Sequence, residues 1–360
     1  MTRENRYIIE ILFENNDRKK NLFNGNVPYF GSPSFTDAFV INTDKITIEA
    51  NRSAIIQLEG IFYNHFSSIY NQIIKALLFY YASTRKFAKI KSLLITRTRS
   101  RQILAEKQFK DEEFSQVLTN SFKLNYTIDP VRLCELFKET PKGITILISV
   151  SYLLSANSAL NENDKFEKLW KGFNKLFAQI GNYENDFNCL RKLKQFIVDN
   201  PGILPLSSNK VHGINTKRLR NSIRWRAMLL DFYDTERKTG GLKDFILRYN
   251  DKRIMEILLE TKYGFREDFL RRHGFFTQVD NHIKHSIASN IINDDEIVTL
   301  LTGKYMYFVR NKTFHGEKID FSFKLSVNND VNKEQNELKF LNSILEPYLI
   351  DLINASHIYP

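Results

Sequence analysis

The sequence predicts a mainly α-helical protein, in which a C-terminal helical bundle follows a mostly helical N-terminal domain with a few short strands. Only 8 prolines and 14 glycines occur among 360 residues, fewer than the many turns of a β-sandwich or barrel normally require. Apolar residues recur at steps of three and four over long segments, which is the helical period. Hydrophobic residues make up 42% of the chain, with 29 Phe and 16 Tyr, so the apolar area suffices for packed cores.

The length of 360 residues favours two domains, because one domain usually has roughly 100 to 200 residues. Pro201 and Gly202 interrupt the helical pattern, and the residues up to Gly213 lack helical spacing. We therefore expect one domain at residues 1–200 and a second at residues 214–360.

The N-terminal elements are expected to be mostly helical. Residues 1–50 contain turn-forming patches at 24–28 and 31–33 and predict an irregular arm, with one or two short strands at 39–56 where β-branched residues are frequent. Residues 54–104 are expected to be helical, because apolar residues recur there at three- and four-residue steps. These apolar residues are Ile55, Leu58, Ile61, Phe62, Phe66, Ile69, Ile73 and Leu77.

Further helices are expected at residues 111–124, 130–138, 145–160 and 166–199. The uncharged run at residues 143–161 has nearly the length of a membrane span, but polar residues interrupt it. These polar residues are Ser149, Ser151, Ser155, Asn157 and Ser158. We interpret the run as a buried helix.

The C-terminal domain is expected to contain helices at residues 217–236, 242–259, 268–272 and 279–292, with a turn at Gly240 and Gly241. Another helix begins near Asp294, where acidic residues suit the positive end of the helix dipole, and runs through Phe308. Strict alternation predicts a short strand at residues 319–327, and a final helix is expected at residues 334–354.

The formal net charge of +11 favours a polyanionic partner, above all nucleic acid, although an ordinary lysine-rich surface explains it equally well. Cys134 and Cys189 are too few and too far apart for a disulfide framework, which indicates a reducing compartment. The first six residues lack the apolar stretch of a secretory signal. We therefore expect a cytoplasmic protein without a membrane partner.

Residues 307–317 combine the groups needed to cleave RNA without a metal ion. Such cleavage requires a proton acceptor for the 2′-hydroxyl, a proton donor for the leaving oxygen and a fixed cation for the phosphoryl oxygens. An imidazole such as that of His315 exchanges a proton near neutral pH, and the Arg310 guanidinium can clamp a phosphate. Asn311 can orient either group. On a straight helix Arg310 and His315 would lie about 140° apart, so we expect the helix to distort or end near the motif.

The order Arg310, Asn311, His315 and Gly316 resembles the signature of the HEPN superfamily, in which an Arg and a polar residue shortly precede a His at the junction of two helices. The resemblance covers residues 217–353 and implies a HEPN-like nuclease domain at 214–360. It further implies a metal-independent endoribonuclease that needs no cofactor and acts as a homodimer, with two motifs in one cleft. HEPN relatives are commonly toxins or effectors of abortive infection and phage defence, so an antitoxin or defence-system partner is also implied. The N-terminal domain would then regulate the nuclease or guide its substrate.

Three alternatives remain open. A non-catalytic HEPN-like subunit would use the same residues to bind RNA or a partner protein. Arg310 could instead stabilise a helix C-terminus while His315 fills the next turn. The third alternative is a helical interaction protein unrelated to RNA.

Two basic clusters are candidate RNA-contact surfaces, one at residues 83–101 and one at residues 217–226. The aromatic residues Phe79, Tyr80, Tyr81 and Phe87 in or beside the first cluster could stack on bases, or could belong to a core beneath a solvated helix face. The residues assigned to RNA contact are Lys217, Arg218, Arg220, Arg224, Arg226 and Lys312, together with Arg97, Arg99 and Arg101.

Other chemistries have little support in the sequence. His273, His282, His285 and Asp280 match no recognised zinc spacing, so we expect no metal site. Glycine-rich phosphate loops and the Gly-x-Ser-x-Gly elbow are also missing from the sequence, which argues against ATP, dinucleotide and acyl-hydrolase chemistry.

Overall fold

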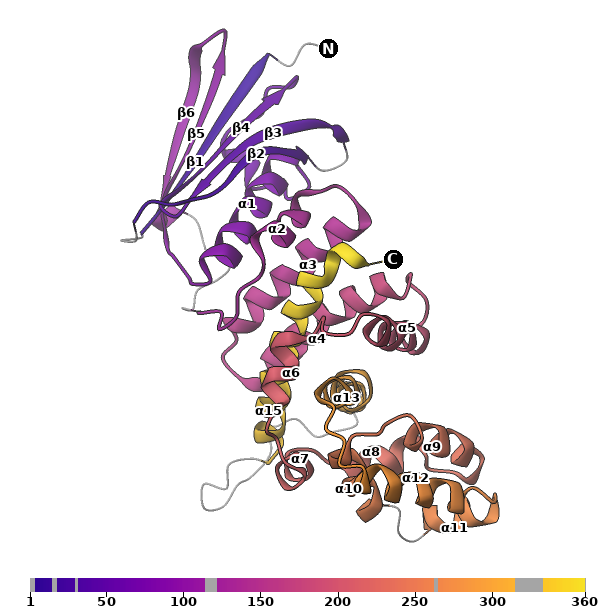
Figure 1. The fold of residues 1–360 in the computed structure, drawn as a ribbon. Helices are drawn as coiled ribbons and strands as arrows, with labels where there is room; N and C mark the ends of the chain where they lie inside the picture. The colour runs from indigo at the N-terminus through magenta and orange to yellow at the C-terminus, as the bar shows by residue number, and fades with distance from the viewer. Residues whose placement is uncertain are drawn as a thin grey trace. The chain divides into compact units, whose positions relative to one another are not determined.

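The computed structural model describes residues 4–14, 18–29, 32–113, 122–261, 265–314 and 333–359. The chain divides into two compact units (Figure 1). We call Met1–Leu193 with Leu352–Pro360 the sheet unit, and Lys194–Asp351 the helical unit. The C-terminal segment joins the sheet unit, where the Asn354 side-chain oxygen accepts a hydrogen bond from the Asp129 backbone N–H at 2.8 Å.

The sheet unit begins with a six-stranded antiparallel sheet in the order β2-β3-β4-β1-β5-β6. Its strands are β1 Asn5–Phe13, β2 Asn21–Tyr29, β3 Ser32–Asn42, β4 Lys45–Arg52, β5 Ile90–Arg99 and β6 Gln102–Lys110. Helix α1, Ser68–Thr84, covers one face of this sheet (Figure 1). The Ser67 hydroxyl caps the start of α1, and Arg85 in the left-handed conformation ends it.

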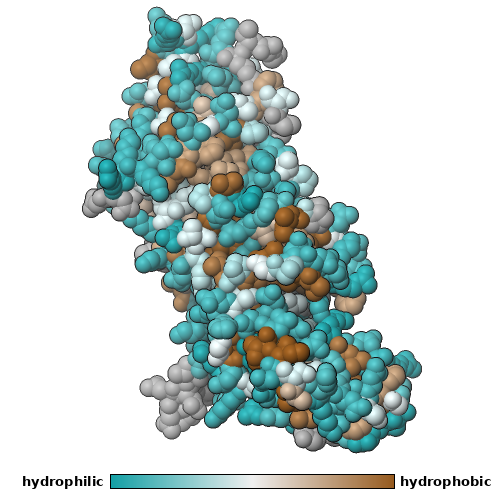
Figure 2. All heavy atoms as spheres, in the orientation of Figure 1, coloured by the Kyte–Doolittle hydropathy of each residue, from teal (hydrophilic) through white to brown (hydrophobic). Residues whose placement is uncertain are grey.

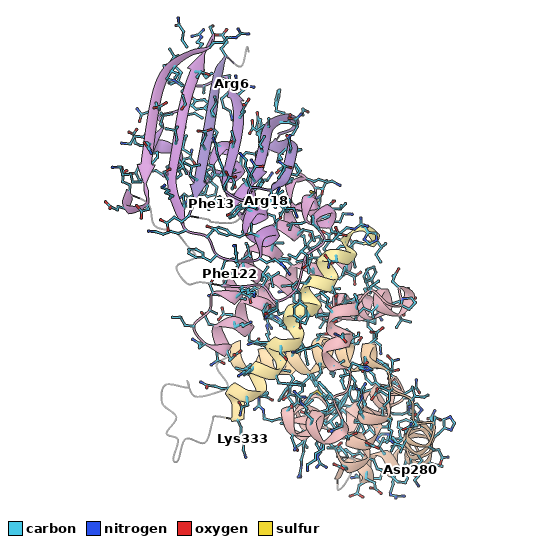
Figure 3. All side chains as sticks on the ribbon, turned by 60° about the vertical axis from the view of Figure 1, so that its left-hand side comes forward. Arg6, Phe13, Arg18, Phe122, Asp280 and Lys333 are labelled. Atoms are coloured by element: carbon cyan, nitrogen blue, oxygen red, sulfur yellow. The ribbon has the colours of Figure 1, made fainter. Side chains whose placement is uncertain are left out.

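The core of the sheet unit lies between α1 and the covered face of the sheet. Ile9 and Ile11 of β1 pair with Ile48 and Ile46 of β4, and all four side chains are fully buried. At the end of β1, the Phe13 ring (labelled in Figure 3) stacks on Tyr80 of α1, with ring centroids 3.8 Å apart. Alternate residues of each strand therefore supply the apolar layer that α1 covers.

The expectation of a mostly helical N-terminal domain is wrong, because this six-stranded sheet occupies most of residues 5–110. The expected helix at 54–104 is confirmed only at Ser68–Thr84 (α1), and the expected arm at 1–50 is four strands. The turn-like patch at 24–28 belongs to β2, where an edge strand tolerates Pro28 and Gly25 because one side needs no ladder hydrogen bonds.

The rest of the sheet unit is helical, and here the expectations at 130–138, 145–160 and 166–199 are confirmed. Its helices are α2 Pro130–Leu133, α3 Pro141–Asn157, α4 Glu162–Ile180 and the first part of α5 Asp186–Asp199, a helix that continues into the helical unit at Lys194. The uncharged run forms α3, whose buried Ser149 hydroxyl donates to the Gly172 carbonyl of α4 at 3.0 Å. Of the expected helix at 111–124, the described residues contain one 3-10 turn, Asp111–Glu113, and residues 114–121 lie outside the described ranges.

The helical unit contains short helices and ends with a long one. They are α6 Pro205–Val211, α7 Thr216–Ser222, α8 Trp225–Phe232, α9 Thr239–Ile246, α10 Lys252–Thr261, α11 Phe265–Arg272, α12 Phe276–Ala288, α13 Asp294–Leu300, α14 Met306–Phe314 and α15 Lys333–Asn354. The expected helices at 268–272 and 279–292 and the final one, which starts at Lys333 (labelled in Figure 3), are confirmed, whereas the single helices expected at 217–236 and 242–259 are each divided, the first into α7 and α8 and the second into α9 and α10. The expected strand at 319–327 lies outside the described residues.

Two expected breaks in the helical unit are wrong. Gly240 and Gly241 lie inside α9. The stretch after Gly202 contains α6, whose first amides are held by a residue far along the chain. The Asp351 carboxylate accepts hydrogen bonds from the backbone N–H groups of Leu206 at 3.1 Å and Ser207 at 2.8 Å. Such a cap from another element cannot be read from local sequence.

Hydrophilic side chains cover most of the face seen in Figure 2, and apolar ones gather there in separate patches. Within the ranges that the structure describes, no helix combines the length and apolar character needed to cross a bilayer.

Candidate active site on helix α14

The motif lies at the end of a continuous helical stretch formed by α13, a π-helical turn at Leu301–Tyr305 and α14. The stretch begins at Asn293, whose side-chain oxygen accepts a hydrogen bond from the Glu296 backbone N–H at 3.2 Å. The expected helix from Asp294 through Phe308 is thus confirmed. A π-helical turn widens the backbone and rotates the residues that follow it, and such turns recur at functional sites.

Helix α14 has a buried side and a half-buried side. Met306, Phe308 and Val309 are buried. Arg310 and Asn311 are half-buried, and at 100° per residue they lie on an arc of about 100° that also contains Tyr307. The two motif residues in the described part of the helix therefore share its more accessible side.

Arg310 and Asn311 contact each other directly. The Arg310 guanidinium donates a hydrogen bond to the Asn311 side-chain oxygen, with a distance of 3.0 Å. This bond restrains both side chains, so a guanidinium and a carboxamide are held together on one side of α14. The helix stays α-helical through Phe314, and His315 lies outside the described residues.

The adjacent side of the stretch, which begins about 60° from Asn311 at Phe308, packs on α8. Lys304, Phe308 and Lys312 follow one another at four-residue steps. The Lys304 Nζ lies 3.6 Å from the centroid of the Phe232 ring. The centroids of the Phe308 and Phe232 rings are 6.4 Å apart. The Lys312 ammonium forms an ion pair of 2.7 Å with the Asp231 carboxylate. Lys312, assigned to RNA contact, therefore also ties α14 to α8.

Arg224, also assigned to RNA contact, joins three elements of the helical unit. Its guanidinium donates from Nε to both Glu337 carboxylate oxygens of α15, at 3.0 and 3.1 Å, and its backbone N–H donates to the Tyr305 hydroxyl at 2.6 Å. The Tyr305 hydroxyl in turn donates to Glu337. Burial and the Glu337 carboxylate raise the pKa of Tyr305, so its hydroxyl stays protonated as a donor.

The remaining cations of the second basic cluster are exposed. Arg220 pairs with the exposed Glu260 carboxylate. No carboxylate of the described residues lies within ion-pair distance of Lys217, Arg218 or Arg226. These three side chains are the members of the cluster that solvent reaches without a competing ion pair.

The first basic cluster lies on the sheet and not on the expected helix face. Arg97 of β5 pairs with the fully buried Tyr7, so it points to the covered face of the sheet. Arg99 forms an ion pair with Glu4, and Arg101 lies in the β5–β6 turn with a φ of 68°.

The aromatic residues beside this cluster belong largely to the core. Phe79 and Tyr80 are fully buried and Tyr81 is 6% exposed, so these three rings cannot stack on bases. These three rings therefore fit the other interpretation, in which the aromatic residues belong to the core.

Glu337 and Lys304 were not predicted from the sequence. Glu337 stands four residues before Leu341 and eight before Leu345, inside the apolar stripe of the final helix, and a carboxylate at such a position indicates a buried cationic partner. Lys304 shares the four-residue spacing of Phe308 and Lys312. That spacing could have shown that it faces a neighbouring helix.

The histidines considered as metal ligands have other contacts. The His282 Nε2–H donates to the Tyr249 backbone carbonyl at 2.8 Å, and His273 lies 3.5 Å from the Glu236 carboxylate. Within the described ranges, no group of three His, Cys, Asp or Glu side chains could hold a metal ion.

The chain was compared with protein-family models, curated proteins and solved structures, and none of them matches it.

Proposed function

We propose that this chain is a metal-independent endoribonuclease of the HEPN type, in which Arg310, Asn311 and His315 act on one RNA phosphate. The observation that carries the proposal is the hydrogen-bonded Arg310–Asn311 pair on the accessible side of α14; His315 is the next residue in the sequence after the described part of the helix. Arginine binds phosphoryl oxygens with a planar, permanently charged group, and the carboxamide fixes its orientation.

The proposed reaction begins with attack by the RNA 2′-hydroxyl oxygen on the adjacent phosphorus. His315 accepts the hydroxyl proton, Arg310 stabilises the charge on the phosphoryl oxygens, and the bond to the 5′-oxygen breaks. The leaving oxygen takes up a proton, which leaves a 2′,3′-cyclic phosphate and a 5′-hydroxyl. A homodimer would bring a second His315 to the same phosphate as the proton donor.

The proposed RNA surface consists mainly of the exposed cations on α7 and α8, Lys217, Arg218 and Arg226, because their charges are not neutralised by nearby carboxylates. Three further assigned cations would contribute where an RNA phosphate replaces or joins the carboxylate that each now pairs with, namely Arg220, Lys312 and Arg99. Arg101 would contribute as well. The sheet unit would regulate the nuclease or guide its substrate. In a cell, the protein would act in the cytoplasm as a toxin or anti-phage effector, controlled by an antitoxin or another defence protein.

A purified-protein assay tests the proposal. The full chain should cleave RNA in EDTA, and His315→Ala and Arg310→Ala should each reduce the rate by about 100-fold or more. Lys243→Gln, a change in the helical unit away from the motif, is the matched control and should cleave like the wild type. Cleavage that survives His315→Ala, or that requires added metal, would overturn the mechanism.

The second candidate is a non-catalytic subunit that binds RNA or a partner protein through the same residues. The +11 net charge is compatible with both functions. Salt-sensitive RNA binding without a cyclic-phosphate product, at high protein concentration, would favour this candidate.

A further inference from the structure

A stripe of four half-buried residues runs along the accessible side of the helical stretch. Gly303 lies in the π-helical turn, and Tyr307 stands four residues after it. Arg310 and Asn311 stand three and four residues after Tyr307. Residues at such steps are neighbours on a helix surface, with Cβ atoms about 5 to 6 Å apart. The stripe therefore joins the motif to the turn that precedes it.

Tyr307 places an aromatic ring next to the motif. The side chains of a helix lean toward its N-terminus, so those of Arg310 and Asn311 lie over the turn that carries Tyr307. By the same rule the Tyr307 side chain lies over the turn of Gly303. Of the two aromatic residues at 306–313, Phe308 is 3% exposed and belongs to the core, whereas Tyr307 is partly open to solvent. Tyr307 is thus the aromatic side chain in this segment that a ligand of Arg310 can reach.

Gly303 leaves space beside this ring. Apart from its chain neighbours and the backbone of its own helix, no atom of the described residues lies within 4 Å of the position that a Cβ would take there. Glycine inside a helix costs stability relative to alanine. Packing within the described part of the chain does not require glycine at this position, because an added Cβ would meet no clash. The space is therefore open to a ligand.

We propose that Gly303 and Tyr307 form a subsite for one unpaired base of the RNA whose phosphate is held by Arg310 and Asn311. The base stacks on the Tyr307 ring and occupies the space over Gly303, one helical turn from the phosphate. Stacking on a side chain requires an unpaired base, because the bases of a duplex cover one another's faces. The substrate class is therefore single-stranded RNA or an RNA loop. This inference rests on the proposed function, since it takes Arg310 as a phosphate ligand.

Fluorescence anisotropy of the full chain at constant ionic strength tests the subsite with two probes of equal length. One probe is a 2′-O-methyl oligoadenylate, and the other has the same backbone without bases. The ratio of the two affinities separates the contribution of the bases from that of the phosphates. Tyr307→Ala should lower this ratio by about tenfold, whereas Tyr307→Phe, which keeps a ring, should preserve it. Gly303→Leu should lower the ratio as much as Tyr307→Ala, because the leucine side chain fills the space of the base.

Two matched controls accompany these variants. Gly240→Leu in α9 repeats the glycine substitution at a helical position where, among the described residues, a Cβ would also meet nothing within 4 Å. Tyr63→Ala removes a tyrosine of the sheet unit that is 87% exposed. Both controls should keep the wild-type ratio. Circular dichroism of each variant reports folding, and Gly303→Leu should fold like the wild type because leucine favours a helix more than glycine does.

A ratio that Tyr307→Ala leaves unchanged, or that either control lowers equally, would overturn the subsite. A loss in Tyr307→Phe equal to that in Tyr307→Ala would also overturn it, because the ring would then not be the contact. The 2′-O-methyl group prevents attack by the 2′-hydroxyl, so the result does not depend on cleavage. A Tyr307-dependent ratio in a protein that cleaves no RNA would support the subsite and refute the nuclease. Cleavage in EDTA that His315→Ala abolishes, with a ratio insensitive to Tyr307→Ala, would do the reverse.

Discussion

The link between Arg224, Tyr305 and Glu337 should be essential to the fold of the helical unit. In Arg224→Ala, the Glu337 carboxylate, with 6% of its side chain exposed, would lose its cation and keep only the Tyr305 hydroxyl. Breaking a buried ion pair from one side costs about 3 to 5 kcal/mol. The Arg224 side chain is 37% exposed, and solvent screens the pair from that side, so we expect a loss of about 2 to 3 kcal/mol.

Urea denaturation followed by circular dichroism measures this loss. Arg226→Ala is the control, because Arg226 is exposed and lies two residues away, and its effect should stay within about 0.5 kcal/mol. Adding Glu337→Gln to Arg224→Ala should recover part of the stability, since a neutral carboxamide needs no cation, with a coupling of about 1 to 2 kcal/mol.

RNA binding provides a second readout for the same variant. Each lost phosphate contact reduces the salt dependence of binding by about one unit of slope. Arg224→Ala should leave the slope unchanged in protein that remains folded, because Glu337 already occupies its guanidinium. An Arg224→Ala protein as stable as Arg226→Ala, or one with a reduced slope, would refute the structural role.

Three further predictions concern buried charges. Burial lowers the pKa of Lys304 from 10.5 to about 8, so the free energy of unfolding should rise between these pH values, where the unfolded chain binds more protons. Because the pKa of Lys194 is lowered in the same way, Lys304→Met should remove only the share of the rise that Lys304 contributes, and it should stabilise the protein at pH 7 by about 1 to 3 kcal/mol in urea titrations. A rise of unchanged size would contradict this. Burial raises the pKa of Asp351 from 3.8 to about 6, so the stability that this carboxyl contributes at low pH is lost as pH rises through 6. Asp351→Asn should reduce the decline in the free energy of unfolding between about pH 4 and pH 7 by up to about 3 kcal/mol. An unchanged pH profile would exclude this carboxyl as the cause. Asp37→Ala should destabilise the sheet unit by about 3 to 5 kcal/mol, because it leaves the buried Arg52 guanidinium without the carboxylate that it contacts at 2.7 Å. A loss of stability below about 1 kcal/mol in a urea titration would show that the pair is dispensable.

The sheet escaped the sequence analysis because its strands do not alternate cleanly. In β1 the buried residues Ile9 and Ile11 are flanked by Ile8 and Leu12, which point to the other face, so apolar residues occupy both faces of the strand and blur the two-residue alternation. The pairing of β1 with β5 joins residues far apart in the chain, and no local pattern reveals such a contact. Helices of the helical unit were easier to predict because their apolar period is local, although the cap of α6 by Asp351 is not.

For the candidate site as well, the sequence predicted the local helix but not the contacts between helices. The helix that carries Arg310 and Asn311 follows from an acidic start near Asp294 and an apolar stripe, both of which are local signals. The roles of Arg224 and Lys312 depend on partners in other helices. Arg224 and Glu337 are 113 residues apart, and a cluster of cations in sequence cannot distinguish a phosphate contact from an ion pair.

The most direct test of the central claim is the identity of the RNA ends made by the wild-type protein in EDTA. Mass spectrometry should find a 2′,3′-cyclic phosphate on one fragment and a 5′-hydroxyl on the other, and a single 2′-O-methyl group at the cleavage position should stop the reaction. Cleavage of the 2′-O-methylated RNA, or fragments with 5′-phosphate ends, would contradict attack by the 2′-hydroxyl and with it the proposed roles of Arg310 and His315.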